Sequence, residues 1–141
     1  MSLLLLLSVQ AQWQNTLVAT ARRLVSEGHY EVAIVTAIMA CETAAERAFS
    51  YWFQKNGMAR FEKVTYDLFP SFSLANDKIC AYYVDISGDK IQTAEFWSEY
   101  KASAKLRGKV VHGQTRATKQ QAENAVAASA AFTAHIAQAA K

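Results

Sequence analysis

Apolar residues recur along most of the chain at the three- and four-residue spacing of an α-helix. No sustained alternation of apolar and polar residues predicts a β-strand, except for at most a short one near the N-terminus. The pattern predicts five main helices, in Val9–Ser26, Glu31 to about Lys55, Ser73 to Ile86, Glu95–Val111 and Thr118 to about Ala140, and a further short one within Met58–Phe69. We therefore expect an all-α bundle of about five helices.

Local signals mark the ends of these helices. Thr118 and Gln121 have the spacing of a capping box, in which each side chain binds the backbone of the other residue. Glycine follows three of the segments, at Gly28, Gly57 and Gly113. A glycine in the left-handed conformation commonly ends a helix, so we expect the segments to stop there.

Two charged residues interrupt the apolar stripes. Arg107 projects from the middle of the stripe on the Glu95–Val111 segment, when that segment is drawn as an ideal helix. Glu42 lies inside the apolar arc of the Glu31–Lys55 segment in the same way. Burying an unpaired charge costs about several kcal/mol. We therefore expect Glu42 and Arg107 to be buried together as an ion pair.

The chain is large enough to fold without covalent or metal cross-links. Its 141 residues are 52% apolar, which predicts a single domain over residues 1–141. Cys41 and Cys80 are too few and too far apart for a disulfide framework or a zinc site. Cys41 lies on an apolar stripe and is expected to be a buried core residue. No motif predicts a metal or a cofactor.

Nothing in the sequence predicts a membrane span. The start, M-S-L-L-L-L-L-S-V-Q-A, lacks the basic region of a signal peptide, so we expect it to be retained. Leu3–Leu7 either extends the first helix or lies against the body as an arm or interface. The next apolar run, Val32–Cys41, is about half as long as a spanning helix. We expect a soluble, cytoplasmic protein that does not interact with membranes.

Positive charge is concentrated near the C-terminal end of the Glu95–Val111 segment. Between Tyr100 and Ala122 there is no acid, and the chain places six of its fifteen basic residues there: Lys101, Lys105, Arg107, Lys109, Arg116 and Lys119. Such a field favours an anionic ligand. The alternative is a solvated lysine face without a ligand.

A short motif in the same region resembles one from a known family. Arg107 and His112, separated by four residues and followed by Gly113, resemble the R-x4–6-H motif of HEPN domains (higher eukaryotes and prokaryotes nucleotide-binding). The segment from Tyr30 to Glu42 is similar to the helix with an inward acid that precedes the motif in such domains. The resemblance covers roughly Val9 to Ala140, although only the motif is specific.

The resemblance implies a homodimeric helical bundle whose active members cleave RNA without a metal. His112 would act as the general acid or base at the 2′-hydroxyl or the leaving oxygen, and Arg107 would stabilise the phosphorane charge. Glu42 would support Arg107, and the cations Lys101, Lys105, Lys109, Arg116 and Lys119 would bind RNA. In active members the residue after the arginine is usually Asn, Asp or His, whereas this chain has Gly108.

Other interpretations of the same residues remain open. Arg107 and His112 are about 140° apart on an ideal helix. They can serve one site only if the helix ends or kinks between them, or if a second chain supplies the other half across a two-fold axis. The alternative function is an inert dimerisation or interaction module with a partner protein, as in a toxin–antitoxin or phage-defence pair, in which Glu42–Arg107 is structural. A third is a small-molecule pocket between aromatic helices. His135 is expected to be solvated.

Overall fold

The computed structural model describes the backbone of residues 3–141 and the side chains of residues 12–141. These residues form six α-helices and two short 3₁₀ turns, Ala59–Phe61 and Ile91–Thr93, and they contain no strand. The helices are α1 (Leu3–Ser26), α2 (Tyr30–Lys55), α3 (Glu62–Leu68), α4 (Asp77–Ser87), α5 (Trp97–Val111) and α6 (Lys119–Ala139). The all-α prediction is confirmed for these residues, with six helices rather than about five.

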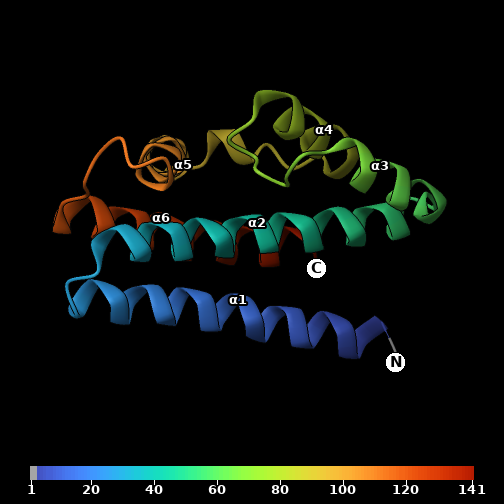
Figure 1. The fold of residues 1–141 in the computed structure, drawn as a ribbon. Coiled ribbons are helices and arrows are strands. Elements are labelled where there is room, and N and C mark those ends of the chain that lie inside the picture. The colour runs from blue at the N-terminus through green and yellow to red at the C-terminus, as the bar shows by residue number, and fades with distance from the viewer. Residues whose placement is uncertain (1–2) are drawn as a thin grey trace.

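The helices are stacked in three layers (Figure 1). The long helices α2 and α6 run in the same direction and form the middle layer, and α1 runs antiparallel to them along one side. Helices α3, α4 and α5 cover the opposite side, where α5 crosses α2 and α6 and is seen end-on in Figure 1. The C-terminal end of α5 and the loop to α6 therefore lie on the opposite side of the middle layer from α1.

Small residues allow α2 and α6 to pack closely. The Ser129 hydroxyl donates a hydrogen bond of 2.6 Å to the backbone carbonyl of Ala37, and the Cys41 thiol lies 3.4 Å from the Ser129 oxygen. Ala37, Cys41 and Ser129 are all fully buried. Alanines at the neighbouring positions of both helices keep the two backbones near each other. Cys41 is therefore a core residue, as predicted, and burial raises the pKa of its thiol to about 12.

An aromatic cluster fills the space between the middle layer and helices α4 and α5. Its fully buried members are Phe49, Phe53, Tyr83, Tyr100 and Phe132. Tyr100 and Phe132 lie closest, with ring centroids 4.6 Å apart, and they join α5 to α6. This cluster holds the N-terminal part of α5, and the Arg107–His112 motif lies at the C-terminal end of the same helix.

The predicted helix ends at Gly113 and Thr118 are confirmed. Gly113 has φ +67°, its N–H donates to the carbonyl of Val110, and the N–H of Gln114 donates to the carbonyl of Lys109. These two bonds form a Schellman motif, which ends α5 at Val111 with His112 as the capping residue. At the start of α6, Thr118 and Gln121 form the predicted capping box.

Several apolar side chains of these helices are exposed. In α3, Val64 is 54% exposed and Leu68 is 73% exposed, because no described residue covers that face of the helix. On α1, Trp13 is 51% exposed, and on α5, Val111 is 57% exposed because it lies in the last turn beyond the core. The side chain of Val9, where the first helix was predicted to begin, lies outside the described residues.

Three boundaries also differ from prediction. The helix expected to be capped by Ser73 begins at Asp77, because the Asn76 side chain accepts hydrogen bonds from two backbone N–H groups. Helix α5 begins at Trp97 rather than Glu95. The backbone of Leu3–Leu7 belongs to α1, so this segment extends the first helix, while its side chains lie outside the described residues. Within the described residues, no helix combines the length and apolar character needed to cross a membrane.

Candidate functional site

Arg107 of α5 and Glu42 of α2 meet where the two helices cross. The Nη1 atom of Arg107 lies 3.3 Å from Oε1 of Glu42, so the predicted ion pair is confirmed. Helix α5 crosses the first half of α2 (Figure 1), and this crossing brings the two apolar stripes, and the charge within each, into contact. The two residues that sequence patterning identified as misplaced charges are therefore partners.

The pair is less buried than predicted. The Arg107 side chain is 37% exposed and the Glu42 side chain 21% exposed, because the pair lies at the edge of the α2–α5 contact. Oε1 of Glu42 and Nε of Arg107 are themselves shielded from solvent, and neither makes a hydrogen bond with acceptable geometry among the described residues. The contact is thus an ion pair without an aligned hydrogen bond, which leaves the arginine able to bind another acceptor.

Replacing Glu42 with alanine should lower the free energy of unfolding by about 1–2 kcal/mol. This is less than the 3–5 kcal/mol for a fully buried pair, because water partly screens Arg107, and more than a typical surface pair. Urea denaturation of wild type, Glu42→Ala, Arg107→Ala and the double variant would give the coupling energy. A coupling energy indistinguishable from zero would contradict a stabilising ion pair.

His112 lies on a different side of α5 from Arg107. It is the exposed C-cap residue of α5, five positions beyond Arg107 and therefore about 140° from it around the helix. It lies about 60° from Lys109 and about 20° from Lys105 in the same projection. The structure consequently brings Arg107 to Glu42, and it groups His112 with the lysines instead.

The predicted RNA-binding cations divide into two groups. Lys101 is 3.0 Å from Asp77 and Lys119 is 3.8 Å from Glu123, so an acid partly neutralises each. The other three, Lys105, Lys109 and Arg116, are exposed and make no ion pair with a described residue. We call these three residues, together with His112, the α5 cationic face.

A partly exposed hydrogen bond holds the loop that carries Arg116. Glu31, at the start of α2, accepts a hydrogen bond of 3.2 Å from the N–H of Ala117. Hydrogen bonds from its own N–H and from that of Ala117 lower the pKa of Glu31, and the nearby charge of Arg116 lowers it further. Glu31 therefore stays ionised near neutral pH and fixes the loop between α5 and α6 against the start of α2.

Sequence reasoning missed a second polar group near the other end of α5. Asp89 accepts a hydrogen bond of 2.6 Å from the Tyr83 hydroxyl, and its carboxylate lies 2.9 Å from Nε2 of His135. The prediction that His135 is solvated is therefore wrong, since the ring also packs edge-on against Phe96. Burial and the hydrogen bond to Asp89 raise the pKa of Tyr83.

The Tyr83–Asp89–His135 group was hard to find from the sequence. Asp89 follows the turn at Gly88, where an acid is usual, and His135 lies outside the single apolar stripe predicted for α6. The one available signal was Phe132, three residues before His135 and hence on the same helical face. The group links α4, the turn and α6, and we regard it as a structural contact.

Comparison with known protein families, with curated proteins and with solved structures finds no match to this chain. The described residues contain no group of three or more His, Cys, Asp and Glu side chains arranged to hold a metal ion. The fold and site define an all-α protein with an exposed cationic face on α5, beside a partly exposed arginine that is paired with an acid.

Proposed function

We propose that this protein binds RNA through the α5 cationic face. The observation that carries the proposal is that Lys105, Lys109, Arg116 and His112 are all exposed in the C-terminal half of α5 and the loop that follows it, and that none of them makes an ion pair with a described residue. Phosphates along a nucleic acid backbone would neutralise the charges of Lys105, Lys109 and Arg116 and release bound counterions. RNA rather than DNA is proposed because the motif resembles that of HEPN domains.

The local backbone supports an ordered surface rather than a flexible charged tail. Lys105 and Lys109 are one helical turn apart on α5, so their side chains are neighbours. His112 follows at the Schellman end of the helix, and the contact between Glu31 and Ala117 holds the loop with Arg116. Cations fixed in this way lose less conformational entropy when they bind a phosphate chain.

Metal-independent cleavage is the finer proposal, and it requires two chains. His112 would transfer protons at the 2′-hydroxyl and the leaving oxygen, and Arg107 would stabilise the negative charge of the phosphorane. Because Arg107 and His112 lie about 140° apart on one helix, the arginine acting with a given histidine would come from a second copy related by a two-fold axis. Glu42 would hold that arginine at the rim of α5.

A second candidate function is an inert interaction module. The contact between Arg107 and Glu42 favours this alternative, since an arginine already paired within the fold has less free charge for a phosphate. Gly108 favours it as well, because it offers no side chain to orient either the histidine or the phosphate. In this function the chain would bind a second copy or a partner protein, and the lysines would be a solvated face.

Removing the cations of the α5 cationic face should weaken RNA binding roughly 10-fold or more, because three phosphate contacts are lost. The variant is Lys105→Ala/Lys109→Ala/Arg116→Ala, measured by fluorescence anisotropy with a labelled oligouridine. The salt dependence should also fall, by about 0.7 in log–log slope for each lost phosphate contact to a single strand. His112 remains in place, so this experiment isolates binding from cleavage.

The matched control removes the same number of lysines and arginines elsewhere. Arg60 lies in the turn before α3, Lys63 in α3 and Lys78 at the start of α4, and all three are exposed. Their triple alanine variant changes the net charge by the same amount. It should bind oligouridine with nearly the wild-type affinity. Equal weakening in both variants would mean that net charge alone attracts RNA, and absence of wild-type binding would favour the interaction module.

A further inference from the structure

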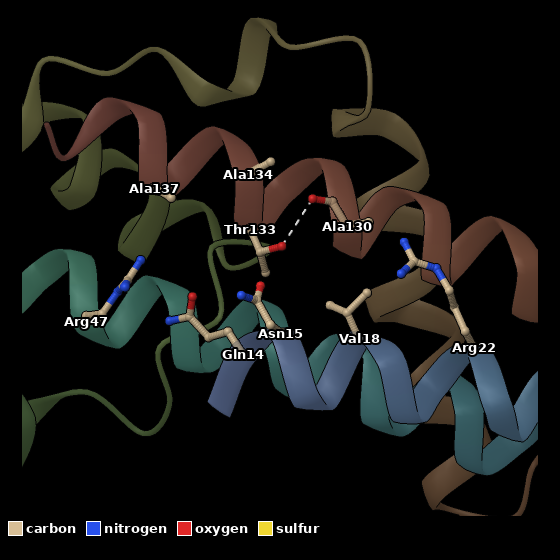
Figure 2. A pocket seen from close by; sticks show the side chains of 9 residues that line it. All are labelled: Gln14, Asn15, Val18, Arg22, Arg47, Ala130, Thr133, Ala134 and Ala137. Carbon is tan, nitrogen blue, oxygen red and sulfur yellow. Dashed lines mark hydrogen bonds between the residues drawn. The ribbon is translucent and has the colours of Figure 1, made fainter. Parts of the chain in front are cut away.

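A cavity of about 370 Å³ lies between α1, α2 and α6 (Figure 2). It is on the opposite side of the middle layer from α5, so it is separate from the proposed RNA-binding face (Figure 1). Its volume is within the range of small-molecule sites. It also differs from the pocket between aromatic helices considered from the sequence, since no aromatic side chain lines it.

Arg47 enters this cavity from α2 without an acidic partner. Its side chain is partly buried, and it forms no ion pair with any described residue. No acidic residue lines the cavity, and the first eleven residues of the chain contain none either. Burial lowers the pKa of Arg47, yet a guanidinium stays protonated in proteins. The cavity therefore contains an uncompensated positive charge.

Gln14 supplies a second unused donor beside Arg47. Its side chain is only 3% exposed, and Nε2 has no hydrogen-bond partner among the described residues. Figure 2 shows its amide extending from α1 towards Arg47. Leaving a buried amide N–H without a partner is unfavourable, so this position favours a ligand with an acceptor oxygen.

The rest of the cavity combines one more cation with an apolar wall. Arg22 reaches from α1 towards α6 at the far end of the cavity (Figure 2). Val18 and three alanines of α6 form an apolar surface between the two arginines. The Thr133 hydroxyl donates to the carbonyl of Ala130 and leaves its oxygen free to accept a hydrogen bond.

We propose that this cavity binds a small organic anion, whose phosphate or carboxylate group contacts Arg47 and Gln14 and whose apolar body lies against Val18 and the α6 alanines. The Arg47 guanidinium and the Gln14 Nε2 amide are both hydrogen-bond donors, and an oxyanion can accept hydrogen bonds from the two together. Arg22 accommodates a second negative or polar group at the other end of the ligand. The site is independent of RNA binding.

Isothermal titration calorimetry of the 141-residue chain with phenyl phosphate, benzoate and benzyl alcohol tests the proposal. Phenyl phosphate or benzoate should bind and raise the melting temperature, and neutral benzyl alcohol should do neither. The anion that binds more tightly identifies the ligand as a phosphate or a carboxylate. Inorganic phosphate should bind more weakly than phenyl phosphate, because it has no apolar body to cover the alanine wall.

Single substitutions locate the binding. Arg47→Gln and Gln14→Leu should each weaken binding of the preferred anion, Arg47→Gln by about tenfold or more. Arg22→Gln should weaken binding less. The neighbouring Arg23 pairs with Glu27 and does not line the cavity, so Arg23→Gln should have no effect. Circular dichroism of each variant confirms folding, and Gln14→Leu provides the test if Arg47→Gln does not fold. The proposal would be overturned if neither anion bound the wild type, or if Arg47→Gln and Gln14→Leu both bound the anion with wild-type affinity.

Discussion

Replacing His112 with alanine should reduce the rate of RNA cleavage by about 10²–10⁴-fold, the usual contribution of a general acid or base. The fold should be unchanged, because His112 is exposed and caps α5 through its backbone, which alanine retains. Cleavage by the wild type should continue in EDTA and leave 2′,3′-cyclic phosphate ends, since the proposed chemistry uses side chains alone. Gel analysis of a labelled RNA measures both the rate and the ends.

His29→Ala is the matched control, since His29 is also exposed but lies in the turn before α2. It should cleave RNA at the wild-type rate. Gly108→Asn adds a gain-of-function test, because a Cβ at Gly108 meets no atom within 4 Å. The asparagine should raise the rate if a missing orienting group limits cleavage. Cleavage that survives in His112→Ala, or that EDTA abolishes in wild type, would refute the enzymatic proposal.

Replacing Phe132 with alanine should lower the free energy of unfolding by about 3–5 kcal/mol, the cost of truncating a fully buried phenylalanine. Phe132 has no exposed surface, and its ring contacts Tyr100 and Phe96 at centroid distances of 4.6 and 6.0 Å. These contacts join α6 to α5, so their loss leaves a cavity under the helix that carries the motif. Urea denaturation followed by circular dichroism measures the change.

Phe61→Ala provides the comparison, because Phe61 is 43% exposed in the 3₁₀ turn before α3. Its truncation should change the free energy of unfolding by within about 0.5 kcal/mol, as for most surface substitutions. Similar effects of the two substitutions would contradict the packing of α5 on α6 described above.

Helix positions could be predicted well from the sequence because several signals agreed. The amphipathic stripes give the extent of each helix, and local signals agree with them. Gly113 marks the end of α5, and the Thr118 capping box marks the start of α6. Where only one signal was available, the boundary shifted: Ser73 is a good cap in isolation, but Asn76 occupies the position that the packed chain uses. The Asn76 side chain accepts hydrogen bonds from the N–H groups of Lys78 and Ile79 and so sets the start of α4.

Burial was harder to predict than helicity. Helix α6 contacts α1, α2 and α5, so a broad arc of it is buried. This arc includes Phe132 and part of His135, which was expected to be solvated. Val64 and Leu68 show the opposite case, because they share a side of α3 that no described residue covers. Periodicity indicates which side of a helix is apolar, but the number of neighbours determines how much of it is buried.

The candidate site shows the same division. Glu42 and Arg107 could be paired from the sequence because charge on an apolar stripe demands a partner, and the two atoms do meet. Their partial exposure depends on where α5 crosses α2, which no local pattern encodes. Arg47 and Gln14 gave no signal, since each is an ordinary polar residue until three helices enclose it.

The most direct test of the central claim is to map RNA contacts residue by residue. Nuclear magnetic resonance of ¹⁵N-labelled protein, titrated with oligouridine, should shift the amides of Lys105, Lys109, His112 and Arg116 most strongly, with little change at Gln14 in the α1 cavity. Raising the salt concentration should reverse these shifts, as expected for phosphate contacts. Shifts confined to other surfaces would contradict RNA binding by the α5 cationic face. The absence of any shift at oligouridine concentrations that bind the Arg60→Ala/Lys63→Ala/Lys78→Ala control would contradict it as well.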